Sequence, residues 1–132
     1  MTKFVQSYDY NTDYRPSMPM VDIGVNKIGK RTPYITISAI IDSGSDGTMI
    51  PLSILKQVDA RYIDQVKVAG ILEQSTWQDR YVVSMWIGKH HFQVVQVVAS
   101  HENIAILGRN VLNQLVVTLN GLAGVVEINV SP

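Results

Sequence analysis

Short runs rich in Val, Ile, Thr and Tyr recur from Met20 to the end of the chain, and residues that favour turns separate them at regular intervals. Runs of this kind are typical of β-strands. We therefore predict a mainly all-β fold that closes on itself like a barrel. The predicted strands are Met20 to Val25, Tyr34 to Ile41, Tyr62 to Val68, Thr76 to Ile87, His91 to Ala99, Val116 to Leu119 and Val125 to Val130.

Two short segments carry helix signals instead. Pro51 to Val58 begins with proline, which suits the first position of a helix, and Asn110 to Leu115 follows a turn at Gly108. Residues 1–19 mix tyrosines, acids and prolines without a period, so we predict an irregular or extended N-terminal arm there. At 132 residues the chain suits one domain, which we assign to residues 20–132.

The composition indicates which partners and which cellular compartment to expect. Eleven basic and eleven acidic side chains cancel, so no overall field favours nucleic acid or a membrane surface, and we expect neither as a partner. The absence of cysteine excludes disulfides and thiolate chemistry. The apolar runs are too short to span a bilayer and the N-terminus lacks the apolar core of a signal peptide, so we expect a cytoplasmic protein.

An acidic residue ends an apolar run at Asp42, directly after Ile40 and Ile41. Burying a carboxylate is costly, so its position needs a reason. One interpretation is a simple turn, in which the Asp and Ser side chains bond neighbouring amides. A calcium loop is a second interpretation, but Ser53 stands where that loop requires glutamate. The third interpretation is a catalytic carboxylate.

A second apolar pair, Ile106-Leu107, also runs into a small-residue turn, as two inner strands of one core would. Ile40-Ile41-Asp42-Ser43-Gly44 resembles the active-site signature of the retroviral-type, or retropepsin-like, aspartic proteases. Ile106-Leu107-Gly108-Arg109-Asn110-Val111-Leu112 resembles the second signature of that family, at the expected distance downstream. The resemblance covers roughly residues 20–120 and suggests a prokaryotic or cellular homologue with the single-domain acid protease fold.

The resemblance implies a role for each matching residue. Asp42 matches the catalytic aspartate, Ser43 the hydroxyl residue that braces the active-site loop across a two-fold axis, and Gly44 the glycine that faces substrate. Arg109 matches the arginine that pairs with the acid after the signature, which is Asp46 here. We expect that ion pair to support the architecture of the site.

Ser45 stands where many family members have alanine, and its hydroxyl is expected to hydrogen-bond the ionised aspartates and lower their apparent pKa. The segment from Val66 to Thr76 would form the flap, a hairpin that closes over bound peptide. Apolar residues are the expected preference at the scissile bond. Flap residues expected to touch substrate are Val68, Ala69, Gly70, Ile71 and Leu72, and Ile50, Leu72 and Ile104 are candidates either for its pockets or for the core.

Hydrolysis of a peptide by acid–base catalysis needs two carboxyl groups, and one signature aspartate is present. The resemblance supplies the second from another copy, so we expect a homodimer that acts as an aspartic endopeptidase on extended polypeptides, with no metal or other cofactor. The residues beyond Gly121 exceed the family pattern, and we expect Val125 to Val130 to fold back on Val116 to Leu119 and build the dimer sheet. The alternative function is a non-catalytic peptide-binding or assembly module that retains the acid protease fold.

Overall fold

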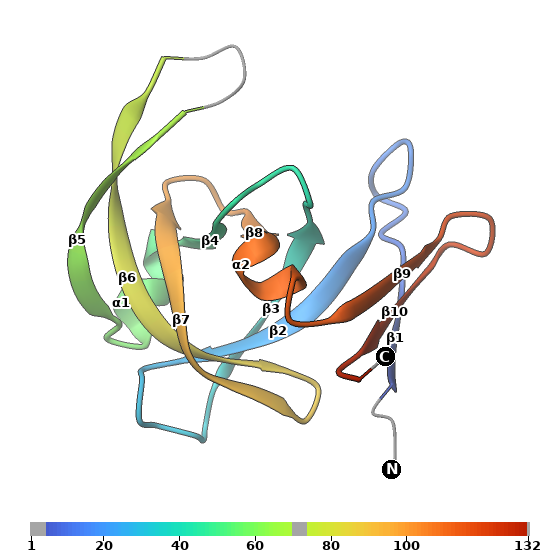
Figure 1. Ribbon diagram of the computed structural model, residues 1–132, viewed down its shortest axis with the longest axis horizontal. Helices are drawn as coiled ribbons and strands as arrows, with labels where there is room; N and C mark the ends of the chain where they lie inside the picture. Colours follow the sequence, from blue (N-terminus) through green and yellow to red (C-terminus); the bar gives the residue numbers. More distant parts are fainter. Residues whose placement is uncertain (1–4, 70–73, 132) are drawn as a thin grey trace.

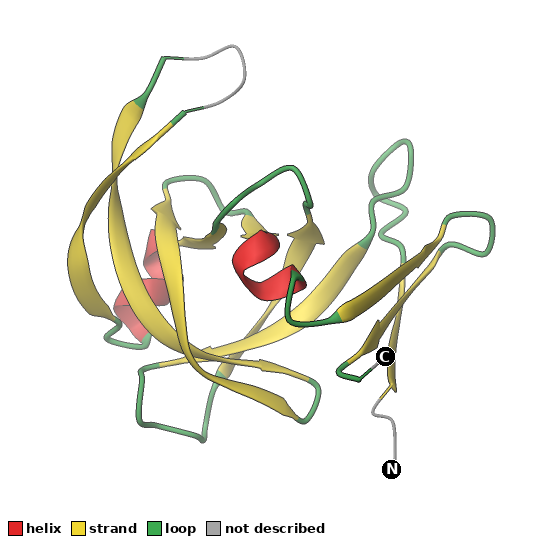
Figure 2. Cartoon of the chain, viewed as in Figure 1, coloured by secondary structure: helices red, strands yellow, loops and turns green. Residues whose placement is uncertain are grey.

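The structure is a computed structural model that describes residues 5–69 and 74–131 (Figures 1 and 2). Strands dominate the described chain and two short helices interrupt them, as predicted. The strands are β1 (Val5–Asp9), β2 (Met20–Asn26), β3 (Ile35–Ile41), β4 (Thr48–Pro51), β5 (Arg61–Val68), β6 (Thr76–Ile87), β7 (His90–Ser100), β8 (Ala105–Leu107), β9 (Val116–Asn120) and β10 (Val125–Asn129), and the helices are α1 (Leu52–Gln57) and α2 (Arg109–Leu112).

Six strands close into a barrel. Their order is β2-β3-β8-β4-β7-β6, and β6 also pairs with β2, which completes the ring, while β5 extends β6 outward as a hairpin. Aliphatic side chains such as Ile23, Met85 and Leu107 fill the interior and are fully buried. The predicted closed all-β fold is therefore confirmed.

The two apolar pairs singled out in the sequence lie side by side. β3 and β8 run parallel, with Ile40 opposite Ile106 and Ile41 opposite Leu107. Both strands end at the same edge of the barrel, so the loop that follows Ile41 meets the turn at Gly108. β8 and β4 are only three and four residues long. β8 contains the Ile106-Leu107 pair that was expected to form an inner strand, whereas β4 was not predicted as a strand.

A separate three-stranded sheet, in the order β1-β10-β9, brings the two ends of the chain together (Figure 1). The β9–β10 hairpin forms as predicted, with Val126 opposite Leu119. The N-terminal arm is extended: β1 pairs with β10, and Tyr8 packs against the main core. Val126 and Ile128 are buried in that core, so this sheet is continuous with the packing of the barrel.

The helices and the flap strands fall close to their predicted ranges. The second helix ends at Leu112 and not at Leu115, because the chain turns over the next three residues. β5 and β6 form the predicted hairpin, paired as far as Val68 opposite Thr76. Among the described residues, no helix is long and apolar enough to cross a membrane.

Candidate active site

Asp42 lies in the loop that follows β3, at the edge of the barrel where β3 and β8 end. Its backbone N–H donates to the Leu107 carbonyl oxygen at 3.1 Å, which extends the parallel pairing by one step. Its carboxylate oxygen Oδ1 accepts a hydrogen bond of 2.9 Å from the Gly44 N–H, and its carbonyl accepts one of 3.2 Å from the Ser45 N–H. The side chain is half-buried. These bonds fix the carboxylate in a tight turn that is still open to solvent.

The two signature segments are joined by polar contacts. The Arg109 N–H donates to the Ser45 carbonyl oxygen at 2.9 Å. Thr48, which is fully buried, accepts a hydrogen bond of 3.1 Å from the Gly108 N–H and donates one of 2.7 Å to Asn110 Oδ1. A hydroxyl can donate once while it accepts, so Thr48 satisfies both neighbours. The loop of residues 42–47, here called the active-site loop, and the start of α2 are therefore joined by hydrogen bonds.

The predicted Asp46–Arg109 ion pair is not among the ion pairs of the described residues. Within residues 5–69 and 74–131, the ion pairs are Lys27–Asp59 and Arg80–Asp64. Arg109 instead donates from Nη1 to the Ser43 carbonyl oxygen at 2.7 Å. Its backbone bond to the loop places the guanidinium beside the Ser43 carbonyl. Arg109 still braces the loop, but through a carbonyl group.

Ser45 also differs from expectation. Its hydroxyl donates to the Gly47 carbonyl oxygen at 2.7 Å, so it bonds its own loop and not the Asp42 carboxylate. Ser45 is therefore a residue that stabilises the turn. Ser43 and Gly44, by contrast, are exposed. Their exposure leaves the predicted contacts with a partner or a substrate sterically possible.

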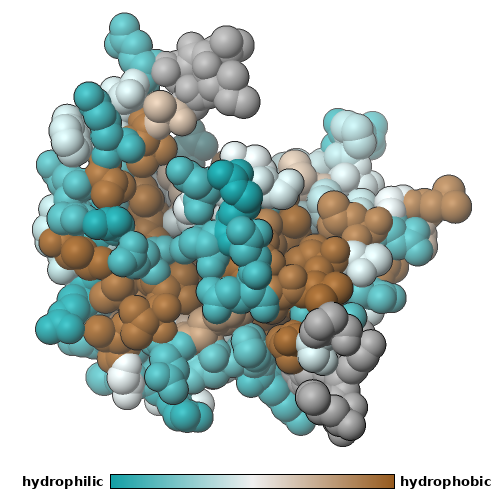
Figure 3. All heavy atoms as spheres, in the orientation of Figure 1, coloured by the Kyte–Doolittle hydropathy of each residue, from teal (hydrophilic) through white to brown (hydrophobic). Residues whose placement is uncertain are grey.

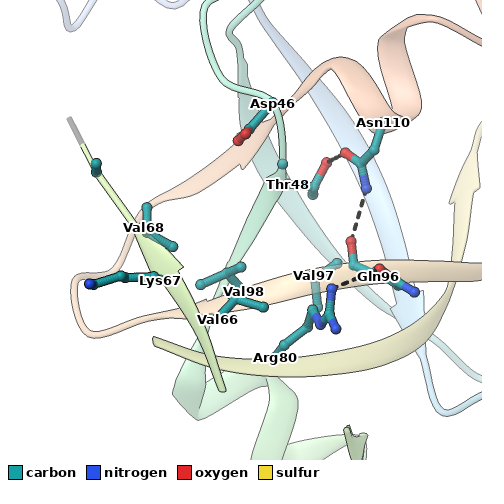
Figure 4. A pocket seen from close by; sticks show the side chains of 12 residues that line it. Asp46, Thr48, Val66, Lys67, Val68, Arg80, Gln96, Val97, Val98 and Asn110 are labelled. Carbon is teal, nitrogen blue, oxygen red and sulfur yellow. Dashed lines mark hydrogen bonds between the residues drawn. The ribbon is translucent and has the colours of Figure 1, made fainter. Parts of the chain in front are cut away.

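A groove of about 340 Å³ lies between the active-site loop, the flap strand β5 and the paired strands β6 and β7 (Figure 4). Arg80 donates to both carboxylate oxygens of Asp64 at 2.8 and 2.7 Å, and from Nη1 to Gln96 Oε1 at 3.3 Å. The Asn110 amide donates to the Gln96 carbonyl oxygen at 2.9 Å. The groove is lined by Asp46, Gly47, Thr48, Val66, Lys67, Val68, Ala69, Arg80, Gln96, Val97, Val98 and Asn110.

Two of the predicted flap residues, Val68 and Ala69, line this groove. Gly70, Ile71 and Leu72 lie outside the described residues. Of the remaining pocket candidates, Ile50 is fully buried and belongs to the core, and Ile104 is exposed but does not line this groove.

Sequence reasoning gave no role to the polar groups that connect the groove. Asn110 stands inside the second signature, which was the available signal. Arg80 and Asp64 are recognisable only from the hairpin register, which sets them opposite each other.

Replacing Thr48 by Val is expected to lower the free energy of unfolding by about 1–3 kcal/mol, because it leaves the buried Gly108 N–H without its acceptor. Chemical denaturation measures the change. Thr36→Val is the matched control, since Thr36 is exposed on β3, and there we expect a change within about 0.5 kcal/mol. Equal stability of the two variants would contradict a bridging role for Thr48.

Comparisons with known proteins identify a family and two similar folds. The model of the family described as retroviral aspartyl protease matches residues 13–120. A retropepsin-like aspartic protease from Rickettsia conorii has a similar structure, with a TM-score of 0.63 and 12% identity over 97% of this chain and 93% of that one. The EIAV protease complexed with the inhibitor HBY-793 is also similar, with a TM-score of 0.60 and 15% identity over 80% of this chain and 92% of that one. These structural similarities concern the fold. No curated protein sequence matches significantly.

Proposed function

Because this chain belongs to the retroviral aspartyl protease family, we propose that it is an aspartic endopeptidase, active as a symmetric homodimer in which each copy contributes Asp42. The observation that carries the proposal is the placement of Asp42. Its carboxylate stands in a turn held by the second signature segment, and residues of the same loop line a groove beside the flap hairpin.

The chemistry follows from two carboxyl groups that face each other. Two carboxyl groups in close contact do not both ionise readily, because the two negative charges repel each other. The pair would therefore hold one proton between them. The ionised carboxylate would take a proton from water, and the protonated one would hydrogen-bond the carbonyl oxygen of the scissile peptide. The protons belong to the pair, and its two titration steps are not those of either residue alone.

The second copy is expected to dock on β9. This strand is an outer member of the β1-β10-β9 sheet, so one side of its backbone has no strand partner among residues 5–69 and 74–131. Val116 and Leu119 on β9 are 38% and 51% exposed, and Figure 3 shows apolar atoms gathered on that side of the molecule. Unpaired apolar edge strands readily pair with another chain. Antiparallel pairing of the two β9 edges would join two three-stranded sheets about a two-fold axis.

The substrate is expected to be an extended polypeptide lying between the flap hairpin and the active-site loop. Such segments bind through backbone hydrogen bonds, and their alternate side chains enter pockets. The groove is lined by the apolar side chains of Val66 and Val68. The polar residues Asp46, Lys67 and Gln96 also line it. It would therefore accept a side chain that has an aliphatic stem and a polar end.

The test of the proposal is the dependence of cleavage on protein concentration, with casein as an unfolded polypeptide substrate. Specific activity is expected to rise with concentration and reach a plateau once the dimer forms. Leu119→Lys would place like charges on both β9 edges, and we expect it to raise the midpoint concentration at least about tenfold, which corresponds to about 1.4 kcal/mol.

Val94→Lys is the control, because Val94 is 63% exposed and lies on β7, which is not part of the β1-β10-β9 sheet. We expect no change in its midpoint. Analytical ultracentrifugation reports the oligomeric state of each variant. Specific activity that stays constant on dilution to a monomer would overturn the dimeric site. Binding of casein with no cleavage at any concentration would favour the alternative, a peptide-binding module.

A further inference from the structure

A second cavity, of about 430 Å³, lies between the β2–β3 connection and the β6–β7 hairpin. Both segments are at the end of the barrel opposite the flap hairpin (Figure 1). The cavity shares no lining residue with the groove between the active-site loop and the flap hairpin. Its polar lining residues are Lys30, Arg31, Ser84, His91 and Gln93.

The floor of this cavity is a fixed polar pair. The β6–β7 register shifts between Val83 and Met85, and such a bulge turns the side chain of Ser84 away from the regular alternation. Ser84 is 1% exposed, and its hydroxyl lies 2.8 Å from Nε2 of His91 and donates to the Gln93 carbonyl oxygen at 3.3 Å.

The orientation of His91 is fixed by an aromatic stack. The His91 ring lies on the Trp86 ring with a centroid distance of 4.2 Å and an interplanar angle of 11°. The Tyr34 ring also stacks on the Trp86 ring, with a centroid distance of 4.8 Å. The imidazole is therefore presented to the cavity without the entropy cost of ordering it on binding.

The charged residues that line the cavity are both cationic, and the acid Asp59, which is paired with Lys27, interacts with Lys30 from outside the lining. Lys30 and Arg31 stand exposed in the β2–β3 connection, and none of the described residues that line the cavity is acidic. Burial lowers the pKa of His91, and the nearby Arg31 and His90 lower that pKa further. An anion placed here would reverse this effect, since it would relieve the repulsion among the cationic groups.

We propose that this cavity binds a small organic anion, whose phosphate or carboxylate group contacts Lys30, Arg31 and His91 and whose apolar part packs on Ile28 and Val94. The cavity volume falls within the range of about 300–1,000 Å³ that is usual for small-molecule sites. Arginine suits both head groups, because its planar guanidinium bonds two oxygens at once. The inference does not depend on the proposed protease activity.

Isothermal titration calorimetry on the full chain tests the proposal with three probes: phenyl phosphate, benzoate and inorganic phosphate. We expect saturable binding of phenyl phosphate or benzoate, and the tighter of the two identifies the head group. Inorganic phosphate should bind more weakly than phenyl phosphate, because it lacks the apolar part. Absence of saturable binding for all three probes would overturn the proposal, and equal affinity for the two phosphates would overturn the apolar contact.

Two matched variants distinguish binding at this cavity from nonspecific attraction to the positive charge of the protein. Arg31→Gln is expected to weaken binding at least about tenfold, whereas Lys56→Gln, which removes one exposed charge on α1, should leave it unchanged. Equal weakening by both variants would overturn the proposal. Arg31 is exposed, so its replacement is not expected to impair folding.

The site should also bind more tightly as the pH falls through the pKa of His91, because protonation adds a positive charge that faces the anion. His91→Phe retains an aromatic ring for the stack on Trp86 and removes both ring nitrogens. Benzoate is the probe for this test, because its carboxylate stays ionised in this range, whereas a phosphate ester titrates at about pH 6. We expect His91→Phe to lose the pH dependence of benzoate binding between about pH 5.5 and 7. A pH dependence that persists in His91→Phe would contradict the role given to this histidine.

Discussion

Replacing Asp42 by Asn is expected to abolish cleavage of casein, with a loss of at least about a thousandfold in rate, while the fold remains intact. Loss of a positioned acid–base group typically costs about 10²–10⁴-fold, and in a homodimer this single substitution removes both carboxyl groups. The fold should survive because the asparagine side chain has nearly the same shape, and its Oδ1 can still accept the Gly44 N–H. Initial rates measure the first effect, and circular dichroism and thermal unfolding measure the second.

Asp46→Asn is the control for a general loss of negative charge in the same loop. Asp46 is exposed and lines the groove, and it forms no ion pair with Arg109. Its replacement is therefore expected to act on substrate binding, and we expect the rate at saturating casein to fall less than about tenfold. A loss in Asp46→Asn as large as that in Asp42→Asn would mean that the loop needs its charge and not one particular carboxylate. Substantial turnover by Asp42→Asn would exclude the proposed mechanism.

A mixing experiment asks whether the two carboxyl groups come from different copies. When the Asp42→Asn chain is added to a fixed amount of wild-type chain, mixed dimers form that hold one carboxyl group, and the measured rate should fall. With equal amounts and random pairing, about a quarter of the dimers keep both wild-type loops. If excess Asp42→Asn chain leaves the wild-type rate unchanged, Asp42 does not act across a dimer interface.

Long strands could be predicted from the sequence, because their apolar and β-branched runs are sustained. Thr76–Ile87 was predicted with both of its ends, and the β9–β10 hairpin was predicted from its turn residues. Ala105–Leu107 and Thr48–Pro51 are too short to show a period, and they become strands because longer neighbours pair with them. The pairing of Thr48–Pro51 is a tertiary effect that no local pattern reports, whereas that of Ala105–Leu107 was anticipated only through the second signature.

The candidate site shows a similar division. The paired signatures predicted that Asp42 and the Gly108 turn would meet, and the parallel register of β3 and β8 places them together. The partner of Arg109 was not predictable, because a carbonyl acceptor leaves no trace in the sequence. The bulge that turns Ser84 into its cavity likewise depends on how β6 pairs with β7.

Replacing Gly108 by Ala is expected to have the largest effect on stability among the variants considered. A Cβ added to Gly108 would lie 2.1 Å from the Gly47 carbonyl oxygen and 2.5 Å from its carbonyl carbon, which are backbone atoms of the active-site loop. The backbone of Gly108 is extended, so the requirement for glycine comes from this close approach and not from its dihedral angles. Relief requires the two loops to separate, and we expect a loss of at least about 3 kcal/mol in the free energy of unfolding.

Gly47→Ala is the matched control, because it adds the same methyl group on the other side of the same contact. A Cβ at Gly47 would meet nothing within 4 Å, and its backbone does not have a positive φ, so we expect a change within about 1 kcal/mol in either direction. Chemical denaturation of both variants measures the difference. If Gly108→Ala unfolds at the same denaturant concentration as Gly47→Ala, the two loops are not in close contact. In that case the hydrogen bonds of Arg109 to the loop could not hold Asp42 in position, since they span the same gap.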